Sequence, residues 1–149
     1  MRSSRLSSAS AGLIAILLLT TACSSGASGG VVVSGAWARP AVSAAEPTAA
    51  YLTITNGSNQ ADTLLSVSSP AAQSIEMHQT SIDSSGMAGM ASLDHVDVAA
   101  GATVTFEPGK MHLMVMGLTG PLAIGDALEL DLVFEHAGTI VVHAQVRQG

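Results

Sequence analysis

The sequence predicts an all-β fold, a sandwich or barrel of short strands, over residues 31–149. Three observations predict it. Segments in which apolar and polar residues alternate recur along this region, as in half-buried strands. Glycine, proline, asparagine and aspartate separate these segments at short intervals, which is typical of turns. No stretch has the apolar spacing of an amphipathic helix. The length of this region suits one domain.

The first residues have the composition of an export signal. Arg2 and Arg5 precede an apolar run at 13–19, and small residues lead from there to Cys23. This charged, apolar, small-residue order is typical of a secretory signal peptide. The apolar run is far shorter than the roughly 20 residues that span a bilayer. We therefore expect residues 1–22 to be a lipoprotein signal peptide.

Cys23 is the only cysteine in the chain, and a lone thiol in an exported protein needs an explanation. The segment 20–23 resembles a bacterial lipobox, although Thr20 stands where leucine is expected. Lipidation of Cys23 would anchor the protein to the outer side of the cell membrane. The alternative is a soluble exported protein that is cut nearby. Residues 23–30 then form a flexible Ser/Gly/Ala tether, about 15 Å in reach, and residues 31–149 form the folded domain.

The charge balance excludes several classes of function. The chain has 5 basic and 11 acidic residues, and removing Arg2 and Arg5 with the signal leaves three basic residues against eleven acidic ones. Nucleic-acid binding requires a basic patch, which is missing. The sequence also lacks a nucleophile elbow, a phosphate loop and a cysteine cluster for zinc. We expect that the protein is not an enzyme.

The predicted strands are, in chain order, 49–55, 64–67, 74–78, 90–98, 102–106, 111–116, 127–134 and 140–146. Turn residues divide them: Asn56-Gly57, the segment 83–86, Pro108-Gly109, and Gly117 after the sixth strand. The alternation is clearest in 127–134 and 140–146. It predicts that Leu128, Leu130, Leu132, Phe134, Ile140, Val142, Ala144 and Val146 point into the core.

The segment 111–116 carries the most distinctive side chains. In a strand, residues two apart share a face. His112 and Met114 therefore point the same way, with Met116 next in the row, whereas Leu113 and Val115 point into the core. A row of His-x-Met on one face is a plausible half of a metal site.

The ligand types indicate which metal. Thioether sulfur is soft and imidazole is borderline, so a set of methionine and histidine favours Cu(I) over Zn(II) and over hard cations. Methionine needs no deprotonation and suits a carrier that must release its ion. A blue-copper electron carrier requires a cysteine thiolate between histidines, and Cys23 lies in the predicted tether, so we exclude that class.

The segment 75–138 resembles the periplasmic copper chaperones of the PCuAC type, whose signature is His-x10-Met-x21-His-x-Met. Met90, His112 and Met114 reproduce the last three positions without a gap, and His78 precedes Met90 by one residue more than the signature allows. Trp37-Ala38-Arg39-Pro40 resembles an early strand of the family. The resemblance implies a cupredoxin-like Greek-key sandwich. It also implies a Cu(I) site made by His78, Met90, His112 and Met114.

The same resemblance implies delivery of copper to the copper centre of a respiratory oxidase, directly or through a second, thiol-bearing assembly protein.

The extra residue between His78 and Met90 falls near 83–89, which leaves Met87 as an alternative ligand to Met90. Core packing is the ordinary role of a strand methionine, and we expect it for Met111. His95, His136 and His143 are interpreted as surface residues. The rival function is an envelope lipoprotein whose sandwich is an interaction module without a physiological metal.

Overall fold

The computed structural model describes residues 29–149, and this part of the chain contains ten β-strands and no helix. No helix within it could therefore cross a membrane. The strands are β1 (Val31–Ala38), β2 (Thr48–Asn56), β3 (Asp62–Ser68), β4 (Ala72–Ile82), β5 (Ala88–Leu93), β6 (Val96–Val98), β7 (Thr103–Phe106), β8 (Met111–Leu118), β9 (Ala127–Phe134) and β10 (Gly138–Val146). The predicted signal peptide 1–22, Cys23 and most of the linker 23–30 lie outside the described residues.

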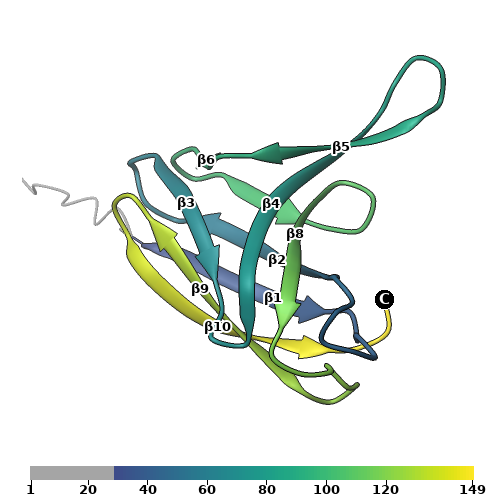
Figure 1. Ribbon diagram of the computed structural model, residues 1–149. Coiled ribbons are helices and arrows are strands. Elements are labelled where there is room, and N and C mark those ends of the chain that lie inside the picture. The colour runs from purple at the N-terminus through teal and green to yellow at the C-terminus, as the bar shows by residue number, and fades with distance from the viewer. Residues whose placement is uncertain (1–28) are drawn as a thin grey trace, which may run out of the picture.

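The strands follow one hydrogen-bonded path in the order β5-β4-β8-β2-β1-β10-β9-β3-β6, and β7 pairs with β2 beside β8. The neighbours β1 and β10 run parallel, and the other pairs in the described part are antiparallel. Figure 1 shows the path curling so that two layers face each other. The predicted all-β, cupredoxin-like fold is confirmed.

The core lies between these layers and is built from alternate residues of each strand. In β9 the four predicted inward residues are at most 2% exposed, and in β8 Leu113 and Val115 are fully buried. Each large apolar side chain that is removed from water contributes about 1.5–3 kcal/mol. In β10, Ala144 and Val146 are buried, and Ile140 and Val142 pack against the core from its edge.

Several predicted strand boundaries are wrong. The strand predicted at 74–78 is longer at both ends, Ala72–Ile82, and the predicted strands did not include β1. The segment 90–98 is not one strand, because it divides at Asp94 and His95 into β5, which pairs with β4, and β6, which pairs with β3. The strand predicted at 111–116 does not end at Gly117 but continues to Leu118, which pairs with Ala72. Gly117 has a φ of +62°, so the strand passes it in a conformation that favours glycine.

The β4–β5 hairpin projects from the body of the molecule (Figure 1). Its turn is the predicted segment 83–86, where the Asp83 carboxylate accepts hydrogen bonds from the Ser85 hydroxyl and from the backbone of Ser85 and Met87. These bonds, the hydroxyl first, lower the pKa of Asp83. Met87 and Met90, on this hairpin, are 68% and 62% exposed.

Asp62 ties the start of β3 to the β9–β10 turn. Its Oδ1 accepts the N–H groups of Thr63 at 2.7 Å and His136 at 3.0 Å, and its Oδ2 accepts that of Ala137 at 2.8 Å. Burial raises the pKa of Asp62, but these backbone hydrogen bonds outweigh burial and hold it below its ordinary value. The buried carboxylate is therefore charged and fully used in holding two loops together.

Candidate metal centre

The predicted ligands are carried by the adjacent antiparallel strands β4, β5 and β8. In β4 and β8, Met77 is opposite Leu113, and both face the core. The next residue pair along these strands, His78 and His112, therefore lies on the outer face of the sheet. The structure brings together two histidines that are far apart in sequence.

The rings of His78 and His112 form a compact edge-to-face pair. Their centroids are 5.7 Å apart and their planes make an angle of 81°. Two imidazoles that share one ion would have centroids about 5–6 Å apart, given metal–nitrogen bonds of about 2 Å. The observed separation therefore fits two ligands of a single ion.

The hydrogen bonds of His78 leave one ring nitrogen for a metal. Its Nε2 lies 3.0 Å from Oε2 of Glu76, and a carboxylate only accepts, so Nε2 carries the proton when the ring is neutral. Its Nδ1 is buried and has no hydrogen-bond partner among the described residues. Burying a polar atom without a hydrogen-bond partner costs about 1–3 kcal/mol of stability. A metal ion bound to Nδ1 would supply the missing partner.

In His112 it is the other ring nitrogen, Nε2, that is available to a metal. Its Nδ1 lies 3.2 Å from the backbone carbonyl of Lys110, which can only accept, so Nδ1 donates and the lone pair is on Nε2. The residue is only 7% exposed. Each histidine is thus oriented by a bond through one nitrogen, as ligand histidines commonly are.

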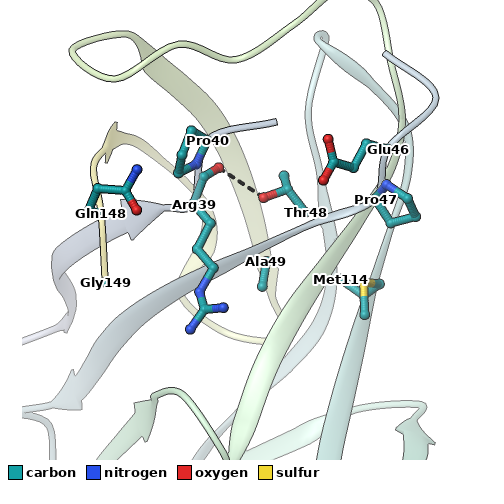
Figure 2. Close-up of a pocket in the computed structure, with 9 residues that line it drawn as sticks. All are labelled: Arg39, Pro40, Glu46, Pro47, Thr48, Ala49, Met114, Gln148 and Gly149. Carbon is teal, nitrogen blue, oxygen red and sulfur yellow. Dashed lines mark hydrogen bonds between the residues drawn. The ribbon is translucent and has the colours of Figure 1, made fainter. Parts of the chain in front are cut away.

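Met114 continues the outer-face row on β8, two residues from His112, and lies opposite Glu76 of β4. It is half-buried and lines a surface cavity of about 460 Å³ at the ends of β1 and β2 (Figure 2). Met116 is next in the row, opposite Ser74. Met111 packs against the core, as predicted.

Met90 lies on the opposite side of the histidine pair from Met114. It pairs with Thr80, two residues from His78 along β4, and so shares the outer face. In a flat sheet its Cα would lie about 16 Å from that of Met114, two strands and four residues away. Met87 precedes β5 and, by alternation, points away from the face that carries Met90. The strand geometry favours Met90, and both remain predictions.

The remaining histidines lie elsewhere, and the described residues form no cluster of carboxylate ligands. His95 and His143 have side chains that are 58% and 60% exposed, and His136 is exposed in the β9–β10 turn. Over residues 29–149 no group of three or more histidine, cysteine, aspartate or glutamate side chains is placed to hold an ion. A metal at the histidine pair would therefore draw on thioether sulfur, which suits a soft ion.

Sequence reasoning missed two residues that lie near the predicted ligands. Glu76 holds His78, and its position two residues away on the same face of β4 was the available signal. Arg39 lines the cavity beside Met114, and no sequence signal connects it with a residue so distant along the chain.

Comparisons with known proteins identify the family of this chain. The profile of a family described as "Putative lipoprotein LpqE-like" matches residues 31–146. The chain is 30% identical over 118 residues to "Putative lipoprotein Lxx21020" of Leifsonia xyli subsp. xyli (strain CTCB07), which covers 79% of this chain and 70% of that protein. It is also 30% identical over 114 residues to "Uncharacterized protein RP573" of Rickettsia prowazekii (strain Madrid E), covering 74% and 62%.

Two solved structures show the same architecture. The copper-bound PCuAC domain from PmoF2 superposes with a TM-score of 0.68 at 24% identity, covering 83% of this chain and 97% of that one. The Cu(I) form of DR1885 from Deinococcus radiodurans superposes with a TM-score of 0.59 at 34% identity, covering 78% and 79%.

The fold and its outer-face histidine pair define a domain of the PCuAC type, a class of copper-chaperone domains and not of enzymes. Within that class, the chain belongs to the LpqE-like family. No comparison identifies a ligand in this chain, so the set of His78, Met90, His112 and Met114 stays a prediction.

Proposed function

We propose that this protein is an extracytoplasmic Cu(I) chaperone that carries one ion on the outer face of its β4–β8 strand pair. The observation that carries the proposal is the pairing of His78 with His112, each with one ring nitrogen free of hydrogen bonds to the described residues. Met114 supplies a thioether beside them. The copper-bound state of two structural relatives supports the same cargo.

Met90 completes the site from the projecting hairpin. Because Met90 and Met114 lie on opposite sides of the histidine pair, both reach one ion only if the hairpin bends toward the body. The hairpin has the freedom for this, since its tip residues are exposed and β5 pairs only with β4 in the described part of the chain. Loading the site would thus draw Met90 out of solvent.

The recipient in this proposal is the copper centre of a respiratory oxidase, reached directly or through a second, thiol-bearing assembly protein. A site of neutral thioethers and imidazoles suits release to a thiolate, which is a stronger Cu(I) ligand. Lipidation at Cys23, followed by a short tether, would hold the domain at the membrane that contains the oxidase. Lipoprotein naming among its relatives supports this location.

Deletion and complementation of the gene test the proposal. Cells without the protein should lose most of their oxidase activity at low copper and regain it when copper is added. The wild-type gene should restore activity at low copper, and a His112→Ala variant should not. A Cys23→Ser variant should leave the membrane fraction. Restoration by His112→Ala would instead support an interaction module that needs no metal.

A further inference from the structure

A polar cavity adjoins the proposed copper site on the side of Met114. Its lining includes Arg39, Glu46 and Met114, from the end of β1, the loop before β2, and β8. The backbone N–H of Arg39 donates to the carbonyl of Ala49, and Ala49 pairs with Met114, so these three residues lie side by side across the sheet. Figure 2 shows Arg39 and Met114 on either side of Ala49.

Arg39 is a cation that makes no ion pair within the described part of an acidic domain. Only Arg39, Lys110 and Arg147 are basic beyond the predicted signal, against eleven acidic residues. Lys110 pairs with Glu107, and Arg147 stacks at 4.4 Å on the Trp37 ring. In residues 29–149 the exposed guanidinium of Arg39 has no carboxylate partner.

The one carboxylate side chain in the cavity lining does not supply this partner. Glu46 uses Oε2 to accept the backbone N–H of Val42 at 3.1 Å, within its own loop. Gly149 also lines the cavity beside Nε of Arg39, and no ion pair joins the two. Among the described residues the cavity therefore presents a planar donor group that makes no ion pair, on the same cavity wall as a half-buried thioether. A guanidinium in that position binds a carboxylate through two parallel hydrogen bonds.

We propose that this cavity is the docking site for a carboxylate side chain of the protein that accepts copper. The inference rests on the proposed function. Met114 is more exposed than His112 and borders the cavity, so a partner held by Arg39 would meet the copper from the Met114 side. Displacement of that thioether would then be the first step of transfer. A membrane surface is a poorer occupant, because a domain with eleven acidic and three basic residues is repelled by anionic lipid.

The test measures Cu(I) transfer from the full-length protein to two synthetic peptides under anaerobic conditions. Both peptides carry the same pair of cysteines, and they differ only in three flanking residues, glutamate in one and glutamine in the other. At low ionic strength the wild type should load the glutamate peptide about 10-fold faster. The preference should shrink at high salt, where the Debye length falls to about 3 Å.

Arg39→Gln should abolish this preference and leave Cu(I) affinity and thermal unfolding unchanged. Arg39→Lys, which keeps the charge but not the paired donors, should keep part of it. Arg147→Gln removes one positive charge that already stacks on the Trp37 ring and should keep the preference, so it is the control. The inference is overturned if the preference survives in Arg39→Gln, or if a wild type that binds copper shows no preference. Either result would leave the proposed function standing.

Two further outcomes would also overturn it. A wild type that binds no Cu(I) would remove the proposed function, and the inference with it. If Arg39→Gln weakens retention on phosphatidylglycerol vesicles but not on phosphatidylcholine vesicles, the arginine serves lipid headgroups rather than a protein carboxylate.

Discussion

His78 and His112 face each other directly across β4 and β8, with Nδ1 of one and Nε2 of the other free of hydrogen bonds to the described residues. The partners that orient the two rings differ in kind. His112 is held by a backbone carbonyl, which no substitution removes, whereas His78 is held by the side chain of Glu76. Of the two hydrogen bonds that orient the pair, only the one to Glu76 can be removed by substituting the acceptor side chain.

Replacing Glu76 with alanine should lower the Cu(I) affinity about 10- to 100-fold, the usual effect of losing a group that orients a ligand histidine. Glu76→Gln should cost less, because its amide oxygen can still accept from Nε2. Competition with a Cu(I) chelator measures both. Glu129→Ala is the matched control, since Glu129 lies 3.4 Å from the exposed His143. Equal losses at Glu76 and Glu129 would show that Glu76 acts only through charge.

Met114→Leu should weaken Cu(I) binding sharply and leave folding intact. Leucine keeps the size and apolarity of methionine, so the cost in unfolding free energy should stay below about 1.5 kcal/mol. Met111→Leu is the control, because Met111 is on the same strand but packs against the core. It should bind Cu(I) normally. If Met114→Leu does too, Met114 is not a ligand.

The two hairpin methionines should differ. Met90→Leu should reduce equilibrium Cu(I) affinity, because Met90 shares the outer face with His78. Met87→Leu should leave affinity nearly unchanged and at most slow transfer, because Met87 precedes β5 and points away from that face. Chelator competition and stopped-flow transfer measure the two effects. The reverse pattern would mean that Met87 is the ligand and that the extra residue lies after it.

Asp62→Asn should destabilise the domain by about 1–3 kcal/mol, because the new amide nitrogen would face an N–H group that now donates to a carboxylate oxygen. The folded pKa of Asp62 is lowered, so its contribution to stability is complete above its unfolded pKa, about 3.9, and is lost as pH falls through the folded value. The unfolding temperature of the wild type should therefore decrease as the pH is lowered below about 4.

In the Asp62→Asn variant this part of the acid dependence should be missing. Ser68, at the other end of β3, is exposed, and Ser68→Ala should alter neither stability nor its pH dependence. If Asp62→Asn is as stable as the wild type, the two loops are held by other contacts.

Alternation along single strands predicted much of the fold. The inward residues of β9, the core positions Leu113 and Val115, and the shared face of His112 and Met114 follow from period two alone. What alternation cannot supply is the pairing between strands. The parallel contact of β1 with β10 and the division between β5 and β6 depend on which strand lies beside which.

The candidate site could be predicted to the same extent, and its ligands remain a prediction. Ligand chemistry and the family spacing selected His78, Met90, His112 and Met114, but not the register that sets His78 opposite His112. The contact of Glu76 with His78 was within reach of local spacing, since the two residues are two apart on one face of β4, but contacts between distant segments, such as Arg39 near Met114, were invisible. They depend on the relative positions of chain segments, which side-chain type and local spacing do not encode.

Anaerobic Cu(I) titration of the full-length protein, followed by X-ray absorption at the copper edge, tests the central claim most directly. We expect one Cu(I) per chain, retained against a chelator, with both nitrogen and sulfur in its coordination shell and no displacement by Zn(II). His112→Ala should lose nitrogen from that shell, and Met114→Leu should lose sulfur. No copper retained against the chelator, or a shell of oxygen atoms alone, would contradict a carrier site at the histidine pair.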